Sequence, residues 1–303
     1  MTKKKKLLLT LRKNSHIYLL LLPAVALTVI FSYLPLAGIK MAFQDYNIYN
    51  PAASVWCGLK NFKAIINMPD CLSAVINTLK INMLSLFICF PITVIFALLV
   101  NELGNIYFKK TIQTISYLPH FLSWISVIAL ITTLYSEGGM INNFLVAVGG
   151  KRFEGVNLLA KQWFFIPNVI ILTIWKSIGW NSIIFLAAIT GVDQSLFEAA
   201  TIDGASRFKQ VVSIILPCIM PTIMIMLLWR IAALFGDNFE LIYGLQNPYV
   251  NVEVIGTYIY KNGIAGGNYQ TTTAFGIMQG VINFAFLIMA NAISKKTTDV
   301  GIF

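Results

Sequence analysis

Continuous apolar runs of about 20 residues or more constrain this chain most, because a helix of that length crosses a hydrocarbon core of about 30 Å. The runs do not alternate as the strands of a membrane β-barrel do. Because 57% of the residues are hydrophobic and only 11% are charged, a soluble globular fold is excluded. The sequence therefore predicts an all-α integral membrane protein with six transmembrane helices, at residues 17–38, 75–100, 112–135, 165–190, 211–235 and 272–293.

Lysine and arginine predict which side of the membrane each loop faces, since they accumulate in short cytoplasmic loops. About twelve lie on the side of both termini, and about seven lie on the opposite side. Both termini are therefore expected in the cytoplasm. This bias and anionic lipid account for the net charge of +10 without a nucleic acid partner.

The predicted organisation is a basic cytoplasmic tail at 1–16, a first helix at 17–38, a five-helix core at 75–293 and a cytoplasmic tail at 294–303. Three external loops of about 30 residues are too short for separate domains, and they serve either as docking surfaces or as plain connectors. Cys57 and Cys71 share the first of these loops, and the sequence does not decide whether they form a disulfide. No cluster of cysteine and histidine predicts a metal site.

A charged segment at 191–210 lies between the fourth and fifth apolar runs. Residues 192–202 are compatible with a helix that has Asp193 as its N-cap and Glu198 in the turn that follows. Gly204 permits a sharp reversal, after which a second short helix is expected to run into the fifth span. The segment is either a docking element for a soluble partner or a loop packed against its own bundle.

Within this segment, several residues stand at fixed separations: Glu198, Ala199, Ala200, Gly204, Ile214, Leu216 and Pro217. Their spacing resembles the EAA loop of ABC importer permeases. Six spans, Asn77-Thr78-Leu79 and the run at 202–205 extend the resemblance over the whole chain. Short aromatic and proline patterns near the N-terminus are similar to those of the LplB-like branch of carbohydrate permeases.

The resemblance implies a type I importer permease of the MetI-like fold in the bacterial cytoplasmic membrane, with oligosaccharides as cargo. The implied partners are a second homologous permease, two ATP-binding subunits that hold ATP and Mg, and an extracytoplasmic sugar-binding protein. This chain itself is expected to bind no cofactor and to catalyse no reaction, since it has no P-loop pattern and no catalytic cluster. Contact with the ATPase is carried over to Glu198, Ala199, Ala200, Asp203 and Gly204.

Polar and aromatic side chains within the predicted spans suggest a hydrated sugar pathway. Five of them recur in the fourth span at i, i+3, i+4, i+7 and i+8 and therefore share one helix face. The ionisable ones rarely face lipid, because a charge at a helix centre costs about 2.5 to 3.5 kcal/mol. The alternative is hydrogen bonding between helices, or snorkelling near a helix end. The candidate pathway residues are Thr173, Lys176, Ser177, Trp180, Asn181, Trp229, Arg230, Asn238, Gln279 and Asn283.

Other functions remain open at this point. An importer permease for a different small solute would share the same features. A secondary carrier or a channel would not need a coupling segment of about twenty residues, and the sequence has no inverted repeat. Co-purification distinguishes these classes, because a permease should bring down an ATPase and a second six-span chain.

Overall fold

The computed structural model describes residues 14–150, 156–236 and 238–298. It divides into two compact units: unit 1 is Met1–Asn67 with Asn262–Met278, and unit 2 is Met68–Lys261 with Gln279–Phe303. Most of the basic tail predicted at 1–16 lies outside the described residues. Within them, six helical segments are long and apolar enough to cross a membrane: Ser15–Phe43, Pro69–Asn101, Trp124–Gly149, Gln162–Thr190, Arg207–Ala232 and Tyr269–Lys296.

Unit 1 begins with an apolar helix and ends its first stretch in a small sheet. Helix α2 (Ser15–Thr28) continues through a π-helical turn (Val29–Tyr33) and a 3-10 segment (Leu34–Phe43), and two short strands, β1 (Gln44–Asp45) and β2 (Val55–Trp56), pair antiparallel. A 3-10 turn (Pro51–Ala53) and α3 (Lys60–Asn67) complete this part. The Asn61 amide donates to the carbonyl oxygens of Ala42 and Gln44, each at 2.9 Å, which fixes α3 against the end of the first span.

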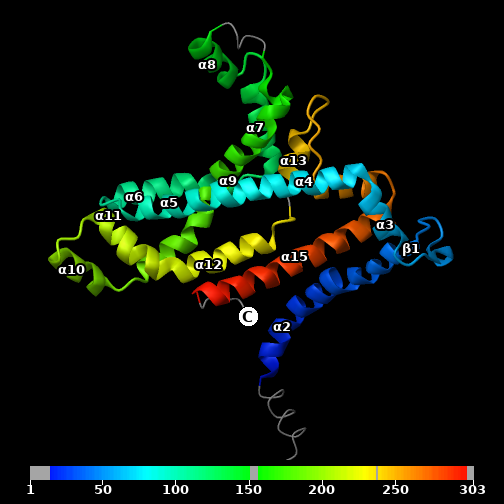
Figure 1. Cartoon of the computed structure of the whole chain (residues 1–303), viewed down its shortest axis with the longest axis horizontal. Coiled ribbons are helices and arrows are strands. Elements are labelled where there is room, and N and C mark those ends of the chain that lie inside the picture. Colours follow the sequence, from blue (N-terminus) through cyan, green and yellow to red (C-terminus); the bar gives the residue numbers. More distant parts are fainter. Residues whose placement is uncertain (1–13, 151–155, 237, 299–303) are drawn as a thin grey trace, which may run out of the picture. The chain divides into compact units, whose positions relative to one another are not determined.

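Unit 2 is organised around two long helices (Figure 1). The first consists of α4 (Pro69–Leu84), a π-helical turn (Ser85–Cys89) and α5 (Phe90–Asn101), and the second is α9 (Gln162–Thr190). Apolar side chains between α5, α9 and the start of the fifth span form a buried core, because each helix presents a continuous apolar stripe to the others. Its members are Val94, Ala97, Val100, Phe185, Leu186, Ile189, Ile215 and Ile219.

The prediction of one continuous span over 112–135 is wrong. Helix α6 (Ile106–Tyr117) ends in a 3-10 turn (Leu118–Phe121), and a new helix, α7 (Trp124–Tyr135), begins after it and turns away from α6 in Figure 1. Pro119 cannot donate a backbone hydrogen bond, and the Ser123 hydroxyl accepts one from the Ser126 amide at 3.1 Å as the N-cap of α7. The membrane-length segment of this region is Trp124–Gly149, which includes α8 (Met140–Gly149).

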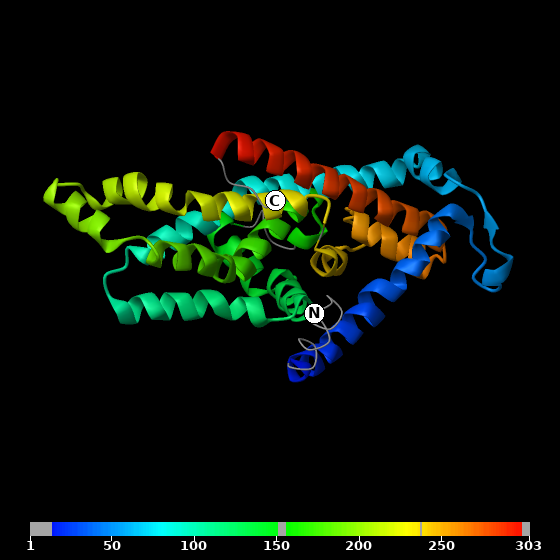
Figure 2. The ribbon, with the colours of Figure 1, turned by 90° about the horizontal axis from the view of Figure 1, so that it is seen from below.

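The remaining elements of unit 2 follow α9. Short helices also occupy the predicted external loops, and the last helix extends into the predicted C-terminal tail. Figure 2 shows the yellow-green helices α10 and α11 at one end of unit 2. The elements are a 3-10 turn (Leu158–Ala160), α10 (Gln194–Ile202), α11 (Arg207–Gln210), a π-helical turn (Val211–Ile215), α12 (Leu216–Ala232), α13 (Phe239–Leu245), α14 (Ile255–Tyr258), a π-helical segment (Ile259–Ala265) and α15 (Tyr269–Thr298).

Cysteines contribute no crosslink to this fold. Cys57 and Cys71, for which a disulfide was open, are both free thiols, as are Cys89 and Cys218. The Cys57 sulfur accepts a hydrogen bond from the Asn61 amide at 3.5 Å. Packing, hydrogen bonds and an ion pair in each unit hold the fold together without disulfides.

Candidate functional site

The coupling segment, residues 191–210, folds as two helices joined by a tight turn. Helix α10 starts at its predicted N-cap, where the Asp193 carboxylate accepts a hydrogen bond from the Ser195 amide at 2.9 Å. Hydrogen bonds from the Ser195 backbone and side chain lower the pKa of Asp193. Glu198 lies within α10, which ends at Ile202, the last residue of the predicted helix at 192–202.

The turn after α10 is a Schellman motif centred on Gly204. The Ala205 amide donates to the Ala200 carbonyl oxygen at 2.8 Å, and the Gly204 amide donates to the Thr201 carbonyl oxygen at 3.1 Å. Gly204 has φ +73°, a left-handed conformation that costs a residue with a β-carbon about 1–2 kcal/mol. The predicted role of Gly204 in a sharp reversal is confirmed.

Side-chain hydrogen bonds also connect the two helices of the coupling segment. The buried Gln210 amide donates to the Thr201 hydroxyl at 3.3 Å and to the Ala205 carbonyl oxygen at 3.2 Å. The Ser206 hydroxyl caps α11 by accepting from the Lys209 amide at 3.4 Å. The bond from Gln210 to Thr201 crosses the Gly204 turn, so it resists a change in the angle between α10 and α11.

One face of the coupling segment is anchored and the other is exposed. Phe197 packs against the buried core between α5, α9 and the fifth span. Glu198, Ala199, Asp203 and Gly204 are exposed, and Ala200 is half-buried. Beside them lies an open recess of about 1120 Å³, formed with the loop after α5 and the end of α9. A protein partner therefore has both a carboxylate and a concave surface to contact here.

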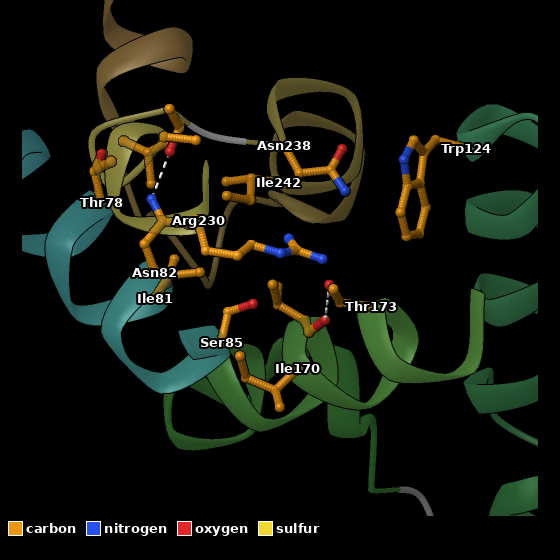
Figure 3. A pocket seen from close by; sticks show the side chains of 14 residues that line it. Thr78, Ile81, Asn82, Ser85, Trp124, Ile170, Thr173, Arg230, Asn238 and Ile242 are labelled. Atoms are coloured by element: carbon orange, nitrogen blue, oxygen red, sulfur yellow. Dashed lines mark hydrogen bonds between the residues drawn. The ribbon is translucent and has the colours of Figure 1, made fainter. Parts of the chain in front are cut away.

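A second candidate site, the central cavity, lies within unit 2 and has a volume of about 390 Å³. Five separate stretches of chain supply its walls. Figure 3 shows Arg230 extending across it, between Asn238 and Ile242 on one side and Ser85 and Thr173 on the other. The lining residues are Thr78, Ile81, Asn82, Ser85, Trp124, Val169, Ile170, Thr173, Arg230, Ala233, Gly236, Asn238, Ile242 and Val254.

Three side-chain amides, the amide cluster, hold the chain where α12 unwinds beside the cavity. Asn82 donates to the carbonyl oxygens of Leu234 at 2.8 Å and Gly236 at 2.5 Å. Gln279 donates to the Phe235 carbonyl oxygen at 2.5 Å, and Asn283 accepts from the Phe235 amide at 3.0 Å. Non-helical backbone at membrane depth needs such partners, because lipid offers none.

Helix α4 holds a second irregular stretch, before α14, in the same way. The Asn77 amide donates to the Glu253 carbonyl oxygen at 2.9 Å, and the Thr78 hydroxyl accepts from the Ile255 amide at 2.9 Å. Lys261 forms an ion pair with the Glu253 carboxylate. Polar residues on one helix therefore fix two wall segments of the cavity.

Arg230 is the ionisable residue among the described residues that line the central cavity. The ion pairs of the described residues are Lys60 with Asp45 and Lys261 with Glu253, so no described carboxylate neutralises Arg230. The hydroxyls of Ser85 and Thr173 and the Asn238 amide lie around it in Figure 3. The described lining residues thus make the cavity polar and give it one positive charge.

The polar and aromatic residues predicted to share one face of α9 lie in two different environments. Thr173 lines the central cavity. The Lys176 ammonium instead donates to the His120 carbonyl oxygen at 3.0 Å and lies 4.9 Å from the centre of the Trp124 ring. Trp180 stacks on His120 at a centroid distance of 4.4 Å. These two residues pack against the turn between α6 and α7.

The other predicted pathway residues have different surroundings. Gln279 and Asn283 belong to the amide cluster. The Ser177 hydroxyl donates to the Thr173 carbonyl oxygen at 2.5 Å. Asn181 and Trp229 are not among the described residues that line the cavity. Sequence reasoning missed eleven lining residues, of which four are polar or aromatic. Three of them, Thr78, Asn82 and Ser85, recur at i, i+4 and i+7 on one face of the second span, a pattern that predicts them, whereas Trp124 carried no such signal.

Comparisons with known proteins give a consistent result. Residues 82–299 match the family model described as "Binding-protein-dependent transport system inner membrane component". The polygalacturonan/rhamnogalacturonan transport system permease protein YteP of Bacillus subtilis (strain 168) is 37% identical over 99% of this chain and 94% of that protein. Protein LplB of the same organism is 36% identical over 97% of this chain and 92% of that protein.

A solved structure is similar over almost the whole length. It is the crystal structure of a bacterial ABC transporter involved in the import of the acidic polysaccharide alginate. The matching chain is 35% identical, with a TM-score of 0.88, and the alignment covers 97% of this chain and 99% of that chain.

Proposed function

Since the chain belongs to the family of binding-protein-dependent transport system inner membrane components and is a multi-pass protein of the cytoplasmic membrane, we propose that it is the permease subunit of an ATP-driven oligosaccharide importer. The cargo is inferred from two relatives that match it along nearly their full length. One is named for polygalacturonan and rhamnogalacturonan transport, and the other belongs to a transporter for the import of alginate.

The complete importer would contain a second homologous permease, two ATP-binding subunits and an extracytoplasmic sugar-binding protein. ATP and Mg would be held by the ATP-binding subunits. With both termini in the cytoplasm, α10 and α11 would face the ATPases. Glu198, Ala199, Ala200, Asp203 and Gly204 would contact them, with the Glu198 carboxylate opposite a basic residue.

The Schellman turn at Gly204 supports this proposal more than any other observation. A coupling element has to transmit a displacement, and a flexible loop would absorb it. Here Gln210 donates one hydrogen bond across the turn to Thr201 and a second to Ala205 just after it. Helix α11 continues into the fifth span, and Phe197 is anchored in the bundle core. Movement of the exposed α10 would therefore reorient α12, whose far end adjoins the central cavity.

The test combines purification with transport. The tagged chain, isolated from its own membranes, should bring down an ATPase and a second six-span permease. The double variant Glu198→Ala, Gly204→Ala should lose ATPase association and reduce ATP-dependent oligosaccharide uptake by at least tenfold, while it inserts normally into the membrane.

The chain offers a matched control for that variant. Glu137 is exposed and precedes Gly138, which has φ +76°, and both lie outside the coupling segment. The double variant Glu137→Ala, Gly138→Ala should bind the ATPase and transport normally. Uptake that needs an ion gradient instead of ATP, with no ATPase in the purified complex, would identify a secondary carrier and contradict the proposal.

A further inference from the structure

The charge of the central cavity bears on which sugars it accepts. Of the described side chains that line it, Arg230 is the one that ionises, and no described carboxylate lies within ion-pair distance of it. Its guanidinium extends into the cavity instead of leaving it (Figure 3). A cation placed there without a counter-charge from the described residues favours a ligand that supplies the negative charge.

The groups around Arg230 define the chemistry of that ligand. Its planar guanidinium matches a carboxylate with two parallel hydrogen bonds, which an ammonium group does not do. Ser85, Thr173 and Asn238 offer hydroxyl and amide groups, and Trp124 closes one side with an aromatic ring. A hydroxyl-rich ring that carries a carboxylate satisfies all of these groups at once.

A second cation adds to the positive potential of the cavity. The Lys176 ammonium lies 4.9 Å from the ring centre of Trp124, a lining residue, and donates to the His120 carbonyl oxygen. Its charge is buried, so water screens it poorly. Both cations raise the preference of the cavity for an anionic sugar over a neutral one of the same size.

We propose that Arg230 is the specificity-determining residue of this permease and that it binds the carboxylate of a uronic acid unit in an acidic oligosaccharide. The proposal rests on the proposed function, because it takes the central cavity as part of the sugar pathway. The substrates are then acidic oligosaccharides, and the Arg230 guanidinium distinguishes them from neutral sugars of the same size.

The experiment uses the complete transporter with its binding protein in proteoliposomes. Uptake of trigalacturonate and trimannuronate is compared with uptake of their fully methyl-esterified forms, which have the same rings without the charge. Because the binding protein is the same throughout, a change in the acid-to-ester ratio between permease variants reports on the permease alone. The wild type should prefer the acids, and Arg230→Met should lower that ratio at least tenfold.

Two further variants refine the comparison. Arg230→Lys keeps the charge but not the paired hydrogen bonds, so its ratio should lie between those of the wild type and Arg230→Met. Lys80→Gln removes an exposed cation of the second span that does not line the cavity, and it should leave the ratio unchanged. If Arg230→Met inserts poorly, thermal stabilisation of the purified complex by trigalacturonate gives the same comparison without transport.

Asp237 needs its own variant, because it stands between the lining residues Gly236 and Asn238 and lies outside the described residues. Under the proposal, Asp237→Asn keeps the preference for acids. Loss of that preference in Asp237→Asn, or an equal loss of acid and ester uptake in Arg230→Met, would overturn the proposal. A wild-type transporter that takes up no oligosaccharide with ATP contradicts the proposed function, whereas ATP-dependent preference for the esters contradicts only the assignment of Arg230.

Discussion

The coupling segment and the central cavity differ in the sequence distance that their hydrogen bonds span. In the coupling segment, Gln210 bonds to Ala205 and Thr201, which are five and nine residues away. At the cavity, Asn82 bonds to Leu234 across 152 residues and Asn77 bonds to Glu253 across 176. The first site therefore depends on a short stretch of chain, and the second exists only once the whole of unit 2 has folded.

The largest effect is expected from Asn82→Ala. This change leaves the carbonyl oxygens of Leu234 and Gly236 without a partner, at a cost of about 1–3 kcal/mol for each buried group. The midpoint of thermal unfolding in detergent should fall by several degrees, and oligosaccharide uptake should fall with it.

Asn143 provides the control for Asn82. Its amide also donates to a backbone carbonyl oxygen, that of Gly138 at 2.9 Å, but Asn143 is exposed and water can replace it. Asn143→Ala should leave the midpoint within about 1 °C of the wild type, since exposed substitutions usually change stability by less than about 0.5 kcal/mol. Equal midpoints for the two variants would show that the long-range hydrogen bonds contribute little to the cavity.

A smaller effect is expected from Gly204→Ala, which tests the coupling segment and its short-range contacts. The left-handed backbone makes alanine unfavourable by about 1–2 kcal/mol, although a β-carbon would contact nothing within 4 Å. ATPase stimulation by the loaded binding protein should fall severalfold. Gly204→Asn should restore most of it, because asparagine tolerates this conformation better. Stimulation that stays low in both variants would point to a requirement for the small side chain itself, contrary to this prediction.

The smallest effect is expected at the N-cap of α10. The pKa of Asp193 is lowered in the folded protein, so its stabilisation is present above the unfolded pKa and is lost as the pH falls through the folded pKa. Acidification should therefore increase amide exchange at residues 194–197, after correction for the intrinsic pH dependence of exchange. Asp193→Asn keeps a capping oxygen that does not titrate, and it should remove this excess. An identical excess in both proteins would exclude Asp193 as its source.

The sequence distance between hydrogen-bonded residues also explains which features can be predicted from the sequence. The capped helix after Asp193 and the reversal at Gly204 depend on neighbours a few residues away, so residue types and spacing predict them. The cavity does not follow from one helix at a time. The stripe on α9 was predicted as one face, yet Thr173 lines the cavity while Lys176 reaches the turn after α6.

Two other features could not be predicted from the sequence, each for a specific physical reason. The break near Pro119 depends on Ser123 acting as an N-cap, and hydropathy does not register it because apolar residues continue on both sides. Gln279 and Asn283 were read as sugar contacts, but the unwound end of α12 needs their amides. A polar residue in a membrane helix can bind cargo or bond to another part of the protein, and sequence alone does not distinguish these roles.

The amide cluster also has a consequence for the transport cycle. It ties the end of α12 to α4 through Asn82 and to α15 through Gln279 and Asn283, and Arg230 lies one helical turn before that junction. Any tilt of α4 against α15 must then displace the guanidinium or break one of these bonds. Release of the cargo would follow from rearrangement of the helices themselves, with no separate gate required at the cation.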